Sequence, residues 1–260
     1  AYSILKKNYG KNGYLEFSDG KNFILKLPEL EKGEERVVFI SYFYDFIFPV
    51  LNSYNLKNKE LEKYFRENEG PYIKENVTIQ AGDIVIDAGA HFGFFSALSS
   101  ALGGIVYAFE PIGETREKYL SKVAELNPNI YIVPFALSNT IGETEIEIPI
   151  SKNYISIDMA SIVRKYENCI KEKIRTITLD KWVEENNIKK IDFIKADIEG
   201  AERLMLEGAA NVLKNFAPKL SICTYHLPDD KEVLTELILK SNPNYIIEYG
   251  KSKLYAYVNR

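Results

Sequence analysis

From residue 82 onward, short apolar runs alternate with stretches that have the spacing of amphipathic helices. The apolar runs cover residues 84–87, 105–110, 130–135, 191–197 and 219–225, and the helical stretches between them cover 94–102, 114–126, 179–186 and 201–213. This alternation is typical of βαβ units, in which parallel strands form one sheet and helices cover both of its faces. The sequence therefore predicts an α/β protein with a doubly wound sheet.

Three regions depart from this alternation. Residues 144–178 hold two strand-like pieces around a polar segment, and we expect an insertion that contributes substrate contacts. The chain ends in a predicted hairpin of residues 245–258, which would add antiparallel edge strands to the mostly parallel sheet. Residues 1–80 combine glycine-punctuated runs with a polar helical stretch. We interpret them as an N-terminal extension of strands and helices on the lid or substrate side of a domain that spans residues 81–260.

The composition excludes several classes of protein. Hydrophobic residues make up 46% and charged residues 27% of the 260-residue chain, close to the averages for soluble globular proteins. The net charge of −4 disfavours a general nucleic-acid binder. The most apolar stretch, residues 39–51, contains Asp45 and is shorter than the roughly 20 residues that cross a bilayer. The start of the chain lacks the features of a secretion signal, so we expect a folded, cytoplasmic protein, whose oligomeric state the sequence does not indicate.

Two smaller features are interpreted as structural. Cys169 and Cys223 lie far apart and form no CxxC pair, so they predict neither a zinc site nor a disulfide framework. Both fit small buried side chains. The aromatic cluster of residues 42–48 is more typical of a core than of a lid.

A glycine-containing turn follows the first of the predicted strands, in the run VIDAGAHFG of residues 85–93. Gly89 and Gly93 would let the backbone approach a ligand closely and point N–H groups at it. Glu110 lies at the end of the next strand, about 20 residues further on, where a carboxylate can accept hydrogen bonds from both ribose hydroxyls. Together these features predict a site for an adenosine cofactor.

The loop sequence distinguishes two kinds of adenosine cofactor. A dinucleotide needs a G-x-G-x-x-G turn for its pyrophosphate, whereas this loop is G-x-x-x-G with bulky Phe92 before the second glycine. The carboxylate of Asp87 would repel a pyrophosphate and attract the ammonium group of S-adenosylmethionine. We therefore predict S-adenosylmethionine as the cofactor, and an NAD-dependent oxidoreductase is the less favoured alternative.

A second motif, DIEGAE of residues 197–202, follows the fourth predicted strand at the sheet edge where doubly wound proteins bind ligands. Asp197 and Glu199 are expected to face the cleft, while Glu202 falls in the first turn of the next helix, where its charge suits the helix N-terminus. His226 follows the fifth strand on the same edge, and histidine is the usual general base near neutral pH. We predict Asp197, Glu199 and His226 as the catalytic residues.

Several ordered blocks between residues 69 and 225 resemble the FkbM-type family of class I S-adenosylmethionine-dependent methyltransferases. They are EGPYIKENVTIQAGDIVIDAGAHFGFFS, the strand end VYAFEP, the blocks IVPFALSN and TLD, and the segment DFIKADIEGAE. The resemblance implies a Rossmann-like fold and an O-methyltransferase, with a hydroxyl of a sugar, a glycoconjugate or another small molecule as the acceptor. His91 stands where the family more often has Asn, and Thr224 where it usually has Glu. These departures keep open a non-catalytic cofactor-binding module with the same fold.

The resemblance and the loop chemistry together give the expected cofactor site. The predicted cofactor-binding residues are Tyr72, Asp87, Gly89, Ala90, His91, Gly93, Glu110, Pro111, Ala136 and Leu137. Tyr72 is included because its segment is implied to close over the cofactor, and residues 136–137 because their block is implied to border the adenine. A divalent metal held by Asp197, Glu199 and Asp180 would be another way to activate a hydroxyl. Carboxylates alone do not assign a metal, so the metal stays an open alternative.

Overall fold

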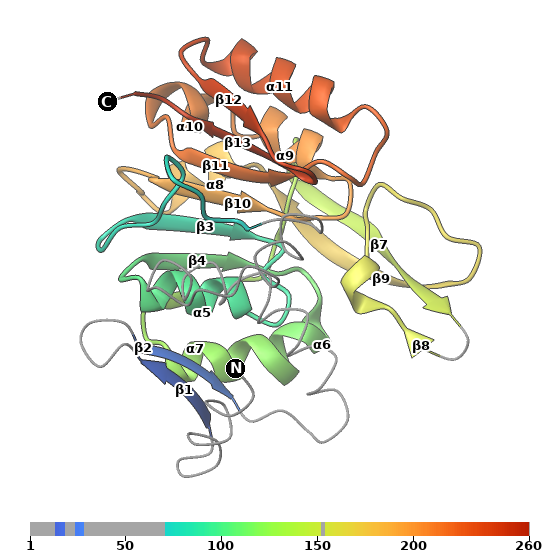
Figure 1. Ribbon diagram of the computed structural model, residues 1–260. Coiled ribbons are helices and arrows are strands. Elements are labelled where there is room, and N and C mark those ends of the chain that lie inside the picture. Colours follow the sequence, from blue (N-terminus) through green and yellow to red (C-terminus); the bar gives the residue numbers. More distant parts are fainter. Residues whose placement is uncertain (1–13, 19–23, 29–70, 152–153, 260) are drawn as a thin grey trace.

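The structure, a computed structural model shown in Figure 1, describes residues 14–18, 24–28, 71–151 and 154–259. The predicted aromatic cluster at residues 42–48 lies outside these ranges, as does most of the N-terminal extension. Among the described helices, none is both long and apolar enough to cross a membrane.

The central sheet has seven strands in the order β12-β13-β11-β10-β3-β4-β5. These are β3 (Ile84–Ala88), β4 (Ile105–Phe109), β5 (Ile130–Val133), β10 (Phe193–Ala196), β11 (Lys219–Cys223), β12 (Ile246–Tyr249) and β13 (Lys253–Tyr257). The strands from β5 to β11 pair in parallel, and β13 pairs antiparallel with both β11 and β12. The mostly parallel α/β sheet with its C-terminal hairpin confirms the predicted fold class. One detail differs from the expected pair of edge strands: β12 lies at the edge of the sheet, and β13 lies between β12 and β11.

Helices cover both faces of the sheet (Figure 1). One face carries α5 (Phe94–Ala101) and α7 (Ser121–Leu126), with the hairpin β1 (Tyr14–Ser18) and β2 (Ile24–Pro28) packed against them. The other face carries α8 (Leu179–Glu185), α9 (Glu202–Glu207), α10 (Ala210–Asn215) and α11 (Asp230–Ser241). Successive strand side chains point to opposite faces, so Val85 joins the first core and Ile86 the second.

Two predicted helices differ in detail from the structure. The stretch 114–126 runs through α6 (Gly113–Thr115), a π-helical turn η2 (Arg116–Leu120) and α7. The stretch 201–213 is two helices, α9 and α10, separated at Gly208. A Cβ atom on Gly208 would lie 2.1 Å from the backbone oxygen of Ser138, so this close approach requires glycine.

Asp180 explains why α10 starts where it does. Its carboxylate oxygens accept the backbone N–H groups of Asn211 (3.0 Å) and Val212 (2.9 Å) in the first turn of α10. The carboxylate that the sequence offered as a metal ligand therefore links α8 to α10 and does not join Asp197.

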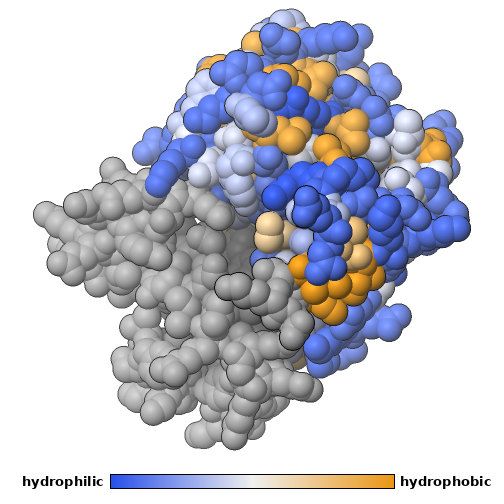
Figure 2. All heavy atoms as spheres, turned by 90° about the vertical axis from the view of Figure 1, so that its right-hand side faces the viewer, coloured by the Kyte–Doolittle hydropathy of each residue, from blue (hydrophilic) through white to orange (hydrophobic). Residues whose placement is uncertain are grey.

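The residues of the expected insertion form a separate antiparallel hairpin. It consists of β7 (Gly142–Ser151) and β9 (Cys169–Ile177), flanked by β6 (Ala136–Leu137) and β8 (Tyr154–Ile155) in a sheet of order β6-β9-β7-β8. A 3-10 turn, η3 (Ile157–Met159), follows β8. The hairpin projects beside the carboxyl edge of the main sheet (Figure 1). Figure 2 shows this side of the molecule, which is largely hydrophilic, with apolar residues gathered beside the grey atoms and again higher on the face.

Candidate active site

A pocket lies beyond the carboxyl ends of β3, β4 and β10 and is closed on one side by the insertion. Of the predicted site residues, those that line it are Gly89, His91, Glu110, Pro111, Ala136, Leu137, Asp197 and Glu199. The space inside it, counted together with the open solvent at its mouth, is about 630 Å³. Parallel strands present their carboxyl ends at one edge, which explains why the sequence could place these residues together.

The glycine loop is fastened to the neighbouring strand. The N–H groups of Gly89 and Ala90 both donate to the backbone oxygen of Phe109, at 3.1 and 3.0 Å. We expected amide groups of this loop to point at a ligand, and the structure uses these two to join β3 to β4. Gly93 directly precedes α5, and a Cβ atom there would lie 2.7 Å from the side chain of Leu120, so glycine at this position serves helix packing rather than the pocket.

Glu110 lines the pocket as predicted and is only 5% exposed. Its two carboxylate oxygens accept the backbone N–H groups of His91 and Ile112, each at 2.9 Å. Burial raises the pKa of Glu110 to about 7, and these two hydrogen bonds limit the rise. Each carboxylate oxygen can accept a further hydrogen bond, so the group can still receive ribose hydroxyls.

Asp87 does not line the pocket, contrary to the expectation that it would attract the cofactor ammonium group. It is fully buried, accepts the Ser96 hydroxyl at 2.6 Å and pairs with the ammonium of Lys195 at 3.0 Å. Lys195 also donates to the backbone oxygens of Gly89 (2.7 Å) and Ala88 (3.2 Å). Burial alone would lower the pKa of Lys195, but Asp87 and other charges raise it. The buried ammonium of Lys195 therefore binds the backbone at the start of the glycine loop.

Sequence reasoning missed the role of Lys195, although a signal was present. A lysine inside the apolar strand run FIKA would be buried, and lysine is almost never fully buried without a partner. Asp87, at the matching position of β3, is that partner. The pair could have been proposed from the parallel register.

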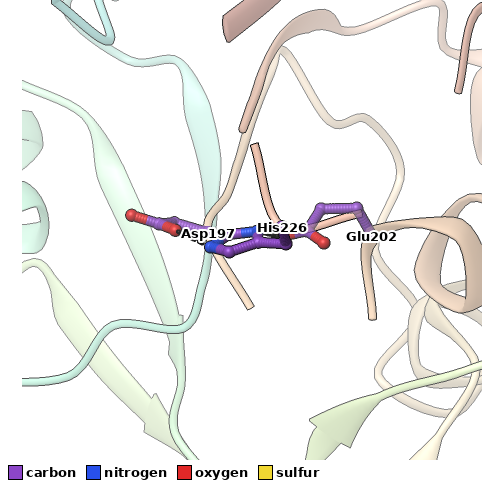
Figure 3. Close-up of side chains that lie close together, drawn as sticks. All are labelled: Asp197, Glu202 and His226. Carbon is purple, nitrogen blue, oxygen red and sulfur yellow. Dashed lines mark ion pairs between the residues drawn. The ribbon is translucent and has the colours of Figure 1, made fainter. Parts of the chain in front are cut away.

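The predicted catalytic residues Asp197 and Glu199 come together with Glu202 around the imidazole of His226. Figure 3 draws two of these carboxylates, Asp197 and Glu202, beside His226. Nε2 lies 3.5 Å from Asp197 and 3.3 Å from Glu199, and Nδ1 lies 3.0 Å from Glu202. The His226 side chain is 1% exposed. Burial alone would lower the pKa of His226, but the surrounding carboxylates raise it to about 10. The imidazole is therefore protonated at neutral pH, which corrects the expectation of a free general base.

Glu202 shapes the turn that holds Asp197 and Glu199. It begins α9 as predicted, and its carboxylate accepts the N–H groups of Ile198 (2.8 Å) and Gly200 (3.0 Å). Glu199 has φ 53° and Gly200 φ 98°, so two successive residues are left-handed. A left-handed residue other than glycine is strained and is characteristic of functional sites.

Two tyrosines contact Asp197, one at each carboxylate oxygen. Tyr72 is buried, outside the pocket lining, and its hydroxyl donates to Oδ2 of Asp197. The expected cofactor contact is thus a partner of the candidate catalytic carboxylate. Tyr225, which the sequence analysis did not single out, is 45% exposed, and its hydroxyl lies 3.4 Å from Oδ1 of Asp197.

The insertion is hydrogen-bonded directly to the turn that holds Asp197 and Glu199. Arg164 donates to the Glu199 carboxylate at 2.6 Å, and the Ser161 hydroxyl donates to the Glu199 backbone oxygen at 2.6 Å. Neighbouring insertion residues that line the pocket are Ile146, Ile157, Asp158, Ala160 and Ile162. The insertion therefore forms one wall of the pocket.

One group of described residues has the ligand types of a metal site, namely Asp197, Glu202 and His226, whose candidate ligand atoms lie within 4.8 Å of one another. Both oxygens of Glu202 already accept backbone N–H groups. This donor set fits an imidazolium held by carboxylates better than a metal ion.

Comparison with known proteins identifies the domain. Residues 87–253 match the family model of the methyltransferase FkbM domain, well over half of the chain. The chain belongs to the FkbM methyltransferase family. This FkbM domain is 26% identical over 157 residues to hexuronic acid methyltransferase AglP of Haloferax volcanii, a match that covers 60% of the chain and 61% of that protein.

A solved structure has the same fold. Methyltransferase FkbM from Methylobacillus flagellatus KT aligns with a TM-score of 0.52 and 23% identity, over 75% of this chain and 50% of that chain. The FkbM domain described here thus spans about three fifths of the curated relative and half of the solved chain. These likenesses confirm both the recognised family and the methyltransferase fold.

Proposed function

We propose that this FkbM domain is an S-adenosylmethionine-dependent O-methyltransferase that acts on a hydroxyl of a sugar or glycoconjugate. The observation that carries the proposal is that one pocket is lined by both Glu110 and Asp197. Glu110 lies at the strand end where a carboxylate can bind the ribose hydroxyls, and Asp197 lies beside His226. A cofactor whose ribose lies at Glu110 has its reactive end directed along the carboxyl edge of the sheet toward β10.

The residues present fit the cofactor. Glu110 retains lone pairs for ribose hydroxyls, and apolar residues suited to a flat adenine ring line the same pocket, among them Ile112, Phe135, Ala136, Leu137 and Ile162. Asp197 and Glu199 supply negative charge toward a cationic sulfonium and its amino-acid group. A dinucleotide fits less well, because the N–H groups of Gly89 and Ala90, which would meet a pyrophosphate, are already bonded to Phe109.

When bound, S-adenosylmethionine supplies a methyl group that passes to an acceptor oxygen while the bond to sulfur breaks and its electron pair stays on sulfur. The domain contributes mainly by positioning the acceptor in line with that bond. Asp197 accepts the hydroxyl proton. Burial alone would raise the pKa of Asp197, but Lys195 and His226 lower it, so the carboxylate is ionised at neutral pH. The proton on His226 keeps Asp197 charged and oriented.

The acceptor class is supported by the relative, not by a bound ligand. AglP carries the name hexuronic acid methyltransferase and aligns over three fifths of this chain. Arg164 of the insertion contacts Glu199, and the exposed Tyr225 contacts Asp197, so both can border a hydroxylated acceptor at these carboxylates.

The first test is calorimetric titration with S-adenosylhomocysteine, with NAD as the control ligand. We expect binding of the former alone, a loss of affinity in Glu110→Ala, and unchanged affinity in Glu117→Ala, which removes an exposed carboxylate nearby. A Glu110→Ala variant that binds like the wild type would contradict the cofactor assignment. Formation of S-adenosylhomocysteine with hexuronic acids or neutral sugars would then establish transfer; binding without transfer to any hydroxyl acceptor would favour a non-catalytic module.

A further inference from the structure

The exposed ring of Tyr225 lies beside the candidate catalytic carboxylate. Tyr225 follows β11 directly and precedes His226, with ring centroids 4.2 Å apart and planes at 47°. It is 45% exposed, whereas the His226 side chain is 1% exposed. Of these two neighbouring aromatic side chains, Tyr225 is therefore the one that solvent reaches.

The two oxygens of Asp197 have different surroundings. Oδ2 accepts the hydroxyl of the buried Tyr72. Oδ1 lies 3.5 Å from Nε2 of His226 and 3.4 Å from the hydroxyl of Tyr225. A hydrogen bond of 3.4 Å is long and weak, so an incoming hydroxyl can replace the Tyr225 hydroxyl at Oδ1 at little cost.

Hydrogen-bonding groups also lie around these carboxylates. Arg164 and Glu199 form an ion pair at 2.6 Å, and their side chains are 29% and 16% exposed. Tyr225 adds an apolar ring with a polar tip, the kind of side chain suited to a surface that is partly apolar and partly wet. A pyranose has the same two characters, because its C–H bonds form an apolar face and its hydroxyls lie around the rim.

We infer that Tyr225 is the acceptor-binding residue: a pyranose ring packs on its aromatic face, and one ring hydroxyl takes the place of the Tyr225 hydroxyl at Oδ1 of Asp197. The inference rests on the proposed function and adds to it the residue that selects a cyclic sugar. A flexible alcohol without a ring face gains nothing from this contact. Tyr225 thereby determines specificity, while Asp197 receives the proton.

Saturation-transfer difference NMR on the domain loaded with S-adenosylhomocysteine tests this contact without turnover. The probes are D-glucuronic acid and methyl β-D-glucopyranoside, one acidic and one neutral. We expect saturation of the C–H protons of at least one sugar by the wild type and by Tyr225→Phe. Tyr225→Ala should lose at least tenfold in affinity for that sugar. Tyr131→Ala, which removes another exposed tyrosine on β5, should bind it like the wild type.

Cofactor affinity, measured in the same variants, separates this inference from the proposed function. All three variants should bind S-adenosylhomocysteine within about twofold of the wild type. Equal sugar binding by Tyr225→Ala and the wild type would overturn the role of Tyr225, and so would the absence of binding by both sugars. Absence of cofactor binding by the wild type would instead overturn the proposed function.

Discussion

A Cβ atom built on Gly89 would lie 2.1 Å from the backbone oxygen of Asp197. The loop after β3 and the turn after β10 are therefore in backbone contact, and no side chain fits between them. Gly89 also has φ 73°, a left-handed conformation that costs glycine little and other residues more. One glycine thus sets the spacing between the β3 loop and the β10 turn.

Gly89→Ala should abolish cofactor binding and lower the melting temperature, because the new methyl group forces the β3 loop away from Asp197. Gly113→Ala is the matched control. Its Cβ would meet its nearest neighbours only at 3.8 Å, so that variant should keep the affinity and the stability of the wild type. Calorimetry with S-adenosylhomocysteine and thermal unfolding measure both effects. Retained affinity in Gly89→Ala would show that the loop tolerates displacement.

The positions of the pocket carboxylates followed from the sequence because they depend on strand ends. Glu110 and Asp197 each come directly after a run of apolar residues, and the parallel pairing of β3 with β4 and β10 brings those ends to one edge. The pattern of apolar runs and the topology of a parallel sheet are enough to place these two carboxylates. The same alternation of apolar runs and helical stretches predicted the fold class.

The contacts of these residues could not be read from local pattern. Tyr72 lies far in sequence from Asp197, and its hydrogen bond depends on how the segment before β3 packs across the sheet. Similarly, His226 already carries a proton at neutral pH, because the carboxylates of Asp197, Glu199 and Glu202 converge on it and raise its pKa. The break at Gly208 depends on a backbone contact with Ser138. Each of these is set by tertiary packing rather than by spacing along the chain.

Cofactor affinity should depend on pH through Glu110. Its pKa is raised to about 7 by burial, and ribose hydroxyls donate more strongly to the ionised carboxylate than to the neutral acid. Affinity for S-adenosylhomocysteine should therefore rise as the pH increases through about 7 and level off above it. Glu110→Ala should bind S-adenosylhomocysteine about 10-fold to 100-fold more weakly, the loss expected for one to two charged hydrogen bonds. Its affinity should not change with pH near 7.

Calorimetry at about pH 6, 7 and 8 resolves this dependence. Glu117→Ala controls for a change in net charge and should keep the wild-type profile. A wild-type affinity that does not change over this range would mean that Glu110 is already ionised or does not contact the ribose.

Neither of the two histidines of the chain should change its protonation state between about pH 5 and pH 8. Burial and the charge of Lys195 lower the pKa of His91 to about 3. The carboxylates around His226 raise its pKa to about 10. His226 is therefore protonated, and His91 neutral, across the whole interval.

Imidazole resonances recorded by NMR across this interval check the expectation, with His91→Asn and His226→Asn providing the assignments. A midpoint near the ordinary histidine value in either residue would contradict it. Because its pKa is raised, protonated His226 stabilises the folded state. This contribution to the free energy of unfolding is complete below the ordinary pKa near 6.5 and is lost as the pH rises through about 10. His226→Asn should lack this alkaline loss.

His226→Ala should lower turnover while cofactor affinity is largely kept. The imidazolium lies against Asp197 and Glu199 but does not line the cofactor pocket. Its loss leaves the carboxylates without their positive partner, which disorders the proton acceptor rather than the ribose contact. Steady-state rates and calorimetry on the same preparation separate the two effects. A parallel loss of affinity and rate would place His226 in cofactor binding instead.

Lys195→Met tests the buried ammonium beneath the glycine loop. The variant leaves the Asp87 carboxylate buried without a positive partner and removes the donor to the backbone oxygens of Ala88 and Gly89. Breaking one side of a buried ion pair typically costs about 3–5 kcal/mol. We therefore expect a loss of that order in the free energy of unfolding in urea, together with weaker binding of S-adenosylhomocysteine.

The double variant Lys195→Met with Asp87→Asn should be less destabilised than Lys195→Met alone, because it removes the uncompensated charge while the amide can still meet Ser96. Lys214→Met, on an exposed position of α10, controls for the loss of a lysine. If Lys195→Met unfolds within about 1 kcal/mol of the wild type, the typical effect of a surface change, the ammonium does not support the loop. A double variant as unstable as the single one would show that the loop carbonyls, rather than Asp87, are what Lys195 stabilises.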